Sequence, residues 1–523
     1  MQVRRPFQRG WVAAALICAG LLALAGHGLA QAPQVFVVAL ETDVVQFDPV
    51  KIQDATTSQV AFQIYEHLLK RDYDGNLEPA LATRWESDPT GQVWTFHLRQ
   101  GVRFHDGSPF NAEVVKWHFE RAMGPDSYFQ TQYSVIDRIE TPDDYTVVFH
   151  LKEPNAAFID NIILANAGFI PSKKAFEEKG DAFPYEPVGT GPFKWNTWVK
   201  GQRVELVRND DWWGDGPKLD RLVIRVIPEA NTQVIELETG GVHLITRASQ
   251  TDLERLQQNP DVVVITKPAY RTRALEFNVA QPPFDDVRVR QAIQYAVDMP
   301  LIVRALAEPL LVPADSVVPV ASWAYAGEGV LPNYPYDLQK AEKLMREAGF
   351  VRDAQGRWTK DGQPLRMTIH TPDNRYYMDV DISAAVANQL TRFGIETNVR
   401  VMEWAAYLEE VRNGQHQIAF LGWNQSSPEP SLFTDAKAKT NGRGNYGNYS
   451  DPALDAILDE ALRVADEAQR RALYAEAQRI VNENAWFIWV GNEALTWIFR
   501  KEVQGFNPSP SMQYNYTEIS IAR

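Results

Sequence analysis

The chain has 523 residues, with 52 basic and 67 acidic side chains and a formal net charge of −15. This length exceeds what one hydrophobic core supports, because cores stop growing at about 250–300 residues, so we expect two or more packed domains. A hydrophobic content of 45% excludes a disordered chain, the acidic balance argues against a nucleic-acid partner, and the single cysteine, Cys18, excludes a disulfide framework and a thiolate metal site.

The first thirty residues have the features of a secretory signal peptide. Three arginines within positions 4–9 precede an apolar run over residues 11–25, and the segment ends on the small residues Gly28 and Ala30. This pattern predicts cleavage after Ala30. An uncleaved anchor is the alternative, and the arginine pair leaves Sec and twin-arginine export both open. We therefore expect an exported mature chain without cysteine in a bacterial periplasm.

Strand-like and helix-like patterns alternate along the rest of the chain, and no internal repeat is visible. Continuous apolar runs predict buried strands at residues 35–40, 222–227 and 262–265. Alternation of apolar and polar residues predicts half-exposed strands around Trp94, Phe96 and Leu98, around Val204 and Leu206, and around Leu365, Met367 and Ile369.

Helices are marked by caps and by apolar residues spaced three and four apart. They are predicted to begin at Asp451-Pro452, at Asp337, at Asp285 or Asp286, and ahead of Leu473. Two clusters of prolines and glycines, at residues 187–192 and 281–283, indicate places where the chain changes domain. The sequence therefore predicts a mixed α/β protein with more than one sheet.

The sequence contains no recognisable catalytic or metal-binding motif. No stretch matches a nucleophile elbow, a zinc-protease helix, a P-loop or an EF-hand. Adjacent carboxylates such as Asp143-Asp144 would point to opposite faces of a strand, which makes them poor acid/base pairs. We therefore expect no catalytic residues, no metal and no cofactor, and binding in place of catalysis.

Short motifs follow one another in a characteristic order. They are YEHLL (65–69), GNLEPALA (75–82), FHLRQGVRFHDGSPF (96–110), PVGTGPF (187–193), DWWG (211–214), PFD (283–285), VRQAI (289–293), GW (422–423), YSDP (449–452) and YAEAQ (474–478). In this order and spacing they resemble the extracytoplasmic solute-binding proteins of ABC importers, in the peptide/nickel-binding family with oligopeptide-, dipeptide- and glutathione-binding members. The resemblance spans the chain from about Val35 onward.

This resemblance implies an α/β, two-lobed periplasmic-binding-protein clamshell of the type II-like, large peptide-binding class. Lobe I would comprise residues 31–57, 187–277 and 490–523, an extra subdomain would be inserted at 58–186, and lobe II would comprise 278–489. The ligand would lie between the lobes, and hinge closure around it would present a surface to a membrane permease.

The function implied is capture of a peptide or peptide-like solute by a periplasmic monomer, which delivers it to an ABC permease and ATPase complex. A non-peptide ligand, such as an oligosaccharide, an opine or chelated nickel, is the alternative within this class. An exported hydrolase is a remote alternative, and a chaperone-like or sensory protein of the same fold is also compatible with the sequence.

The resemblance also points to ligand-binding residues. In peptide-binding relatives a Gly-Trp pair is followed, three residues after the Trp, by an Asp that pairs with the ligand's α-ammonium. Here Trp423 is followed by Asn424, and Ser426 stands at the position of that Asp. A hydroxyl cannot supply the charge-assisted bond of a carboxylate. This departure argues against standard recognition of a peptide N-terminus, unless Glu429 substitutes through a shift of the loop.

Five further residues are candidates for ligand contact. Thr42 follows the first strand, where relatives offer backbone groups to an extended ligand, and Trp489 lies where relatives place an aromatic ring in the cleft. Arg375 and Tyr376 follow a strand. The guanidinium of Arg375 could bind a carboxylate through two hydrogen bonds. Asn445 lies in a glycine-rich loop that is either a lid or a simple connection.

Overall fold

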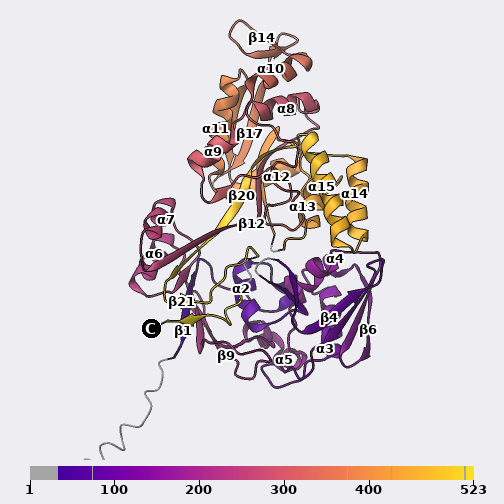
Figure 1. Ribbon diagram of the computed structural model, residues 1–523, viewed down its shortest axis with the longest axis vertical. Helices are drawn as coiled ribbons and strands as arrows, with labels where there is room; N and C mark the ends of the chain where they lie inside the picture. Colours follow the sequence, from indigo (N-terminus) through magenta and orange to yellow (C-terminus); the bar gives the residue numbers. More distant parts are fainter. Residues whose placement is uncertain (1–32, 73–74, 374, 426, 512–513, 523) are drawn as a thin grey trace, which may run out of the picture.

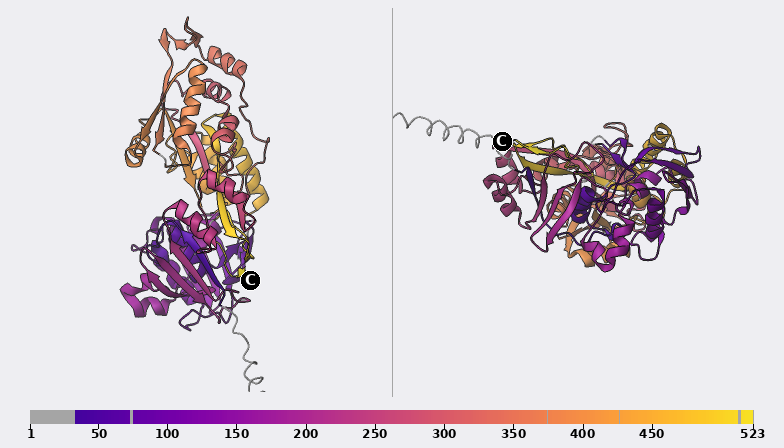
Figure 2. Two further views of the ribbon diagram at one scale, coloured as in Figure 1. Left: turned by 90° about the vertical axis from the view of Figure 1, so that its left-hand side faces the viewer. Right: turned by 90° about the horizontal axis from the view of Figure 1, so that it is seen from below.

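The computed structural model describes residues 33–72, 75–373, 375–425, 427–511 and 514–522. Two lobes are stacked along the long axis of the molecule, with lobe I at the bottom and lobe II at the top of Figure 1, and the side view in Figure 2 shows the same division. Two long strands, β12 (Val262–Phe277) and β20 (Phe487–Arg500), run from one lobe into the other. The predicted signal peptide, residues 1–30, lies outside the described residues.

Lobe I is built on a mixed sheet in which the strand order is β20-β11-β1-β10-β9-β8. Its other strands are β1 (Val35–Leu40), β8 (Phe193–Val199), β9 (Arg203–Arg208), β10 (Arg221–Val226) and β11 (Leu244–Ile245). β1 pairs in parallel with β10, and β10 pairs antiparallel with β9. The predicted strands at 35–40, 204–206 and 222–227 are therefore confirmed, and the one at 262–265 is the start of β12.

Three helices and the C-terminal tail cover this sheet. The helices are α2 (Ala55–Ile64), α6 (Ala230–Thr239) and α7 (Gln250–Gln257), and the tail forms a short hairpin of β21 (Val503–Gln504) and β22 (Ser520–Ile521). The tail is held to the N-terminal part of the lobe, because the Gln63 side chain donates to the carbonyl of Tyr514 at 2.6 Å and the Ile521 amide donates to the Gln34 side chain at 2.8 Å. The two ends of the described chain thus close lobe I together.

The inserted subdomain has its own antiparallel sheet, in the order β4-β5-β7-β6, and its own core. Its strands and helices are β2 (Leu69–Arg71), β3 (Leu77–Pro79), β4 (Ala82–Ser87), β5 (Val93–Leu98), β6 (Ile136–Asp143), β7 (Thr146–Leu151), α3 (Ala112–Met123), α4 (Gln130–Tyr133) and α5 (Lys173–Lys179). Four short helical turns complete this half of the molecule, at Pro49–Lys51, Ile159–Ile163, Asn166–Gly168 and Gly180–Tyr185. Phe119 packs edge-on against Phe149 at the centre of the subdomain core, with 4.9 Å between ring centroids.

Lobe II continues the same sheet in the order β18-β17-β19-β12-β20, with β13 paired to β20. Its other strands are β13 (Leu311–Val312), β17 (Arg366–Pro372), β18 (Glu396–Met402) and β19 (Ile418–Asn424), and a small separate sheet holds β14 (Val351–Arg352), β15 (Trp358–Lys360) and β16 (Gln363–Pro364). One core packs beside helices α8 (Val287–Tyr295), α9 (Met299–Leu306), α10 (Leu338–Glu347) and α11 (Asp379–Arg392). A second core packs beside α12 (Trp404–Arg412), α13 (Ser431–Lys437), α14 (Pro452–Arg463) and α15 (Glu467–Glu483).

The predicted helix starts in lobe II are confirmed by their caps. The Asp451 carboxylate accepts hydrogen bonds from the backbone at the start of α14, with Pro452 in the first turn. Asp337 caps α10 in the same way, and Asp286, not Asp285, caps α8. The fourth predicted helix is α15, which begins after Asp466.

The domain ranges inferred from the sequence stay a prediction. The packing of the cores indicates where the chain crosses from lobe I to lobe II. Leu275 and Phe277 of β12 pack in a lobe II core, whereas Val263 and Ile265 pack beside a lobe I core. Between them the register of β12 on β20 shifts, from Pro268 to Thr272. This packing favours a boundary inside the two long strands and not at residue 277.

The glycines at 189 and 191 are required by a close approach of two chain segments. A Cβ at Gly189 would lie 2.0 Å from the carbonyl oxygen of Ile64, and one at Gly191 would lie 2.7 Å from that of Gln63. The segment therefore packs directly on the end of α2. Its backbone carbonyls are used inside the protein, since Asn209 donates to the Gly191 carbonyl at 3.0 Å.

Two of the sequence motifs meet at a buried carboxylate between α2 and β2. The indole nitrogens of Trp212 and Trp213 donate to the carboxylate of Glu66 at 3.3 Å and 3.0 Å. Burial raises the pKa of Glu66 from 4.5 to about 7, against the opposing effect of these indole hydrogen bonds. The native protein therefore holds a proton here that the unfolded chain loses between these two values, and stability falls as pH rises through that window.

We expect Glu66→Gln, which cannot ionise, to remove the fall of about 2 kcal/mol or more in the free energy of unfolding that the wild type shows as pH rises from 4.5 to about 7. Near the ordinary pKa of a glutamate the variant should be the less stable protein, because its amide nitrogen cannot accept one of the two indole hydrogen bonds. Relative to the wild type, the variant should therefore gain stability from acidic to neutral pH. Urea unfolding on both sides of the window measures this difference. Glu78→Gln is the matched control, because Glu78 is exposed beside Lys70. An equal gain at both pH values would contradict the assignment.

Candidate functional site

The pairing of β12 with β20 is irregular where the two strands pass from one lobe to the other. β12 pairs with β20 up to Pro268 and resumes at Thr272, with a register shift between them. Proline has no backbone N–H to donate to the ladder, and a bulge re-aims neighbouring side chains. Tyr270 and Arg271 fall within this stretch, so the irregularity places their side chains at the junction of the lobes.

A cluster of charged side chains lies directly after this irregularity. Arg271 on β12 forms an ion pair with Glu493 on β20 at 2.7 Å, and Arg273 pairs with the other oxygen of the same carboxylate. The Arg273 guanidinium also donates to the side chain of Asn424, at the end of β19, at 2.9 Å. Two guanidinium groups thus share one carboxylate in this group of side chains, which we call the hinge cluster (Arg271, Arg273, Asn424 and Glu493).

The electrostatics of the hinge cluster keep Glu493 ionised. Burial alone would raise the pKa of this carboxyl, but the charges of Arg273 and Arg271 outweigh burial and hold the pKa below its ordinary value. Arg273 is only 2% exposed, whereas Arg271 is 21% exposed. Arg271 is therefore the more accessible of the two guanidinium groups.

The inserted subdomain reaches lobe II next to the hinge cluster. Arg71 on β2 binds both oxygens of Asp160, and the hydroxyl of Ser427 in lobe II donates to Asp160 at 2.7 Å. A second link joins the Ala156 amide to the carbonyl of Leu462 on α14, also at 2.7 Å. A cavity of about 30 Å³ lies at this contact, lined from both sides by Phe62, His67, Lys70, Arg71, Asp160, Leu164, Ser427 and Ser511.

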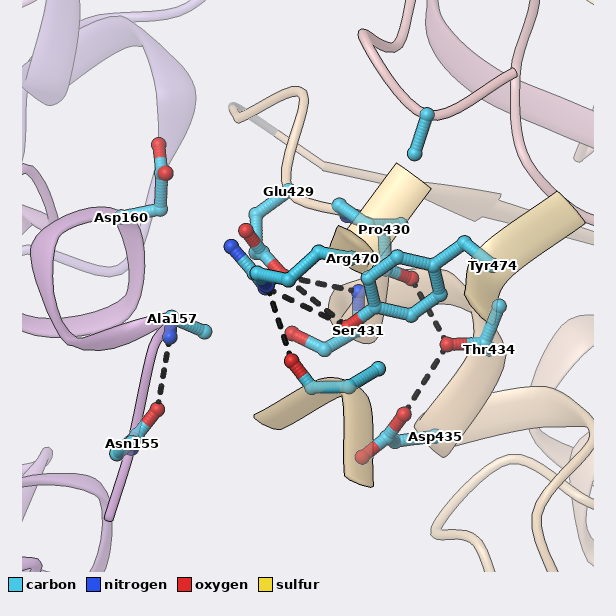
Figure 3. A network of polar contacts seen from close by, with 12 residues as sticks. Asn155, Ala157, Asp160, Glu429, Pro430, Ser431, Thr434, Asp435, Arg470 and Tyr474 are labelled. Atoms are coloured by element: carbon cyan, nitrogen blue, oxygen red, sulfur yellow. Dashed lines mark hydrogen bonds and ion pairs between the residues drawn. The ribbon is translucent and has the colours of Figure 1, made fainter. Parts of the chain in front are cut away.

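Glu429 lies behind this contact, in a buried network that belongs to lobe II. Its carboxylate is fully buried and pairs with Arg470 on α15 at 2.6 Å, and the Tyr474 hydroxyl lies 3.5 Å from the same oxygen. Arg470 also donates to the carbonyl of Ala461 at 3.0 Å. Figure 3 shows this network beside Asp160 of the inserted subdomain. Its charges are matched within lobe II, so it secures the packing of α13 and the loop before it on α15.

Two of the candidate residues from the sequence lie at the hinge cluster. Asn424 is part of it, and the ring of Tyr376 lies 4.9 Å from the guanidinium carbon of Arg273. The Tyr376 hydroxyl donates to the carbonyl of Gly422 at 3.2 Å, which fixes the ring against β19. Ser426 lies outside the described residues.

The other candidates lie in different surroundings. Trp423 is 8% exposed and packs in a lobe II core, with the ammonium of Lys437 4.1 Å from its ring centre. The Asn445 amide is used within its own loop, where it donates to the carbonyls of Lys439 and Tyr449. The loop is thus internally bonded at this residue.

Thr42, Arg375 and Trp489 also make contacts apart from the hinge cluster. Thr42 shares a hydrogen bond with Thr56 in lobe I. Arg375 is exposed and lies over the ring of Trp404 at 5.0 Å. Trp489 stacks on Phe487 with 4.6 Å between ring centroids and lines a separate cavity of lobe II.

The residues that sequence reasoning missed are Arg71, Asp160, Arg271, Arg273 and Glu493. The signal that could have found three of them is the presence of charged residues inside long strand-like runs, at 262–277 and 487–500. A charge in a strand that is otherwise buried needs a partner on a neighbouring strand. Nothing in the sequence says which strands are neighbours.

Within the described ranges no group of three or more His, Cys, Asp or Glu side chains is arranged to hold a metal ion. The same part of the chain contains no helix that is both long and apolar enough to cross a membrane.

We expect Arg470→Met to lower the free energy of unfolding by about 3–5 kcal/mol, because it leaves the buried Glu429 carboxylate without its cation. Adding Glu429→Gln to the same chain should recover part of this loss. Arg479→Met is the matched control, since Arg479 lies on the same helix in an exposed pair with Glu476 and should change stability far less. Urea unfolding of the four proteins measures the effect, and equal losses for the two arginines would refute a structural role for the buried pair.

Comparison with known proteins places the chain in a family. The model of the bacterial extracellular solute-binding proteins, family 5 Middle, matches residues 76–445. Heme-binding protein A of Haemophilus influenzae is 29% identical over 494 residues, 89% of this chain and 88% of that protein. The glutathione-binding protein GsiB of Salmonella typhi is 30% identical over 498 residues, 93% and 94% of the two chains.

The fold has a counterpart among solved structures. The periplasmic binding protein DppA from Helicobacter pylori, associated with an ABC transporter and solved in complex with the peptide STSA, matches with a TM-score of 0.72 and 29% identity, over 94% of this chain and 98% of that one. The α/β two-lobed fold and the family resemblance inferred from the sequence are both confirmed. The chain belongs to the bacterial extracellular solute-binding proteins, family 5.

Proposed function

We propose that the protein is the periplasmic substrate-binding component of an ABC importer. It captures a peptide or peptide-like solute between lobes I and II and delivers it, as a monomer, to a permease and ATPase complex in the inner membrane. Export would use the signal peptide at residues 1–30. Under this proposal the protein performs no covalent chemistry. Its whole mechanism is reversible capture of the solute with closure of the hinge.

One observation carries the choice of ligand: the hinge cluster places two guanidinium groups at the junction of the lobes, and the Arg271 side chain is partly exposed there. A guanidinium favours a solute with a carboxylate, because it binds a carboxylate through two parallel hydrogen bonds. Arg271 is the group that we assign to this contact, because it is the more exposed of the pair. Tyr376 and Asn424 are assigned to the walls of the same site.

The family context supports this choice. The named relatives bind heme and glutathione, and the named solved structure holds a peptide. Peptides, glutathione and heme all carry carboxylates. A neutral oligosaccharide would gain less from the hinge cluster, and chelated nickel would have to bring its own ligands. If the protein were instead a hydrolase, a cleavage product would appear in an amount that rises with the protein concentration.

The first test of this function concerns the carboxylate of the solute. We expect Arg271→Gln to weaken the binding of trialanine by about ten-fold or more, because the peptide carboxylate loses its guanidinium partner. Binding of trialanine amide should change little, and Arg479→Gln, on the exposed face of α15, should leave both peptides unaffected. Calorimetry on the protein freed of co-purified ligand measures each value. Equal losses for the acid and the amide would contradict the role of Arg271.

The second test concerns the peptide amino terminus. We expect Ser426→Asp to tighten the binding of trialanine by about ten-fold, since a carboxylate replaces a hydroxyl opposite the ammonium. N-acetyl-trialanine, which has no ammonium, should gain nothing, and Ser426→Asn, which has the shape of Asp without its charge, is the matched control. Mass spectrometry of the ligand that purifies with the wild type identifies the solute class independently. A native ligand without a carboxylate would overturn the peptide proposal.

A further inference from the structure

A second and much larger cavity lies wholly inside lobe II. Its volume is about 700 Å³, within the range of about 300–1,000 Å³ typical of small-molecule pockets. Its lining residues fall in the ranges 294–335 and 482–489, so they come from α8, α9, the chain from β13 to α10, the end of α15 and the start of β20. Among the residues that the structure describes, none of lobe I or of the inserted subdomain lines this lobe II cavity, which therefore differs from the junction between the lobes.

Aromatic side chains form its fixed wall. Trp489 and Phe487 on β20 stack with an interplanar angle of 23°, and Tyr325 and Tyr334 also line the cavity. The Trp489 indole donates to the side chain of Asn482 at 3.0 Å, so its ring cannot turn freely. A flat apolar group entering the cavity would meet rings that are already held in place.

The chain that covers the cavity is held by the same asparagine. The Asn482 amide donates to the backbone carbonyls of Asp315 and Pro332, at 2.6 Å and 3.0 Å. The Tyr334 hydroxyl donates to the backbone carbonyl of Asn482 at 2.7 Å. Three hydrogen bonds thus hold the covering chain to Asn482 at the end of α15.

The cavity has charge of one sign only. Its lining includes the carboxylates of Asp315 and Glu328 and no Lys, Arg or His. Among the described residues neither carboxylate has a basic side chain within ion-pair distance, and Asp315 accepts a hydrogen bond from the Tyr325 hydroxyl at 2.8 Å. Burial raises the pKa of Asp315, and the nearby charge of Glu328 acts in the same direction. Within the described part of lobe II, no cation therefore forms an ion pair with either carboxylate.

A polar group is also left without a partner there. Gln294 on α8 lines the cavity and is 7% exposed. Within the part of the chain that the structure describes, its amide nitrogen has no hydrogen-bond partner. A buried donor of this kind is satisfied either by a water molecule or by an acceptor on a ligand.

We propose that the lobe II cavity is a second binding site, for a small organic cation that has a flat apolar body. The ammonium group would lie near Asp315 and Glu328, and the apolar body would lie against Trp489 and Tyr325. A cation close to a tryptophan face gains further attraction from the ring. An anionic ligand is disfavoured by the two carboxylates, and a neutral one gains only the apolar contact.

Phenethylamine, which is protonated at neutral pH, is a direct probe of this site. We expect it to bind the full mature chain at least about ten-fold more tightly than 2-phenylethanol, and phenylacetate to bind weakest, by calorimetry and saturation-transfer NMR. Asp315→Asn and Glu328→Gln should each remove most of the preference for the amine while leaving 2-phenylethanol unchanged. Asp381→Asn, an exposed carboxylate on α11, is the matched control.

The test separates this site from the proposed solute site between the lobes. Arg271→Gln should leave phenethylamine binding intact, and Asp315→Asn should leave trialanine binding intact. No preference for the amine over the alcohol, or an equal loss in Asp381→Asn and Asp315→Asn, would overturn the proposal. Glu328→Gln keeps the test decisive if the Asp315 variant misfolds. Glu328 is exposed, and replacing it leaves the hydrogen bond between Tyr325 and Asp315 in place.

Discussion

The antiparallel pairing of β12 with β20 is the interaction on which the rest of the molecule depends. Among the described strands it is the ladder that runs through both lobes, and the strands of lobe I and lobe II extend the same sheet on either side of it. Because the ladder is interrupted between Pro268 and Thr272, the lobes are joined by continuous chain but not by a continuous set of hydrogen bonds. A bend concentrated at this point moves each lobe as a body and keeps its core packed.

The charged groups near the lobe junction divide into two kinds by their balance. Glu429 and Arg470 are one carboxylate and one guanidinium, fully enclosed, and they cancel within lobe II. Asp160 and Arg71 cancel within the inserted subdomain. In the hinge cluster two guanidinium groups bind the two oxygens of a single carboxylate, and Arg271 is the more exposed of the two. A guanidinium that stays partly accessible at the junction of the lobes can bind the carboxylate of a solute.

Much of the fold could be predicted because its signals are local. The caps at Asp337 and Asp451 and the apolar run of β1 depend on neighbours in the sequence, and they fold as expected. The site depends on which strands lie side by side. Asn424 was found through its motif, but Arg271 and Arg273 act only through Glu493, some 220 residues away. Trp423 and Trp489 show a second limit of prediction from sequence. The size and apolarity of a tryptophan do not say which of several cores or cavities its ring will enter.

The order of the strands along the chain has a consequence for folding. Lobe I needs β20 beside β11, and lobe II needs it beside β12. The strands that flank β20 in the large sheet all precede it in the sequence, so neither half of this sheet is complete before residues 487–500 have been synthesised. Until then each half has an exposed strand edge, and the same strand then completes both lobes.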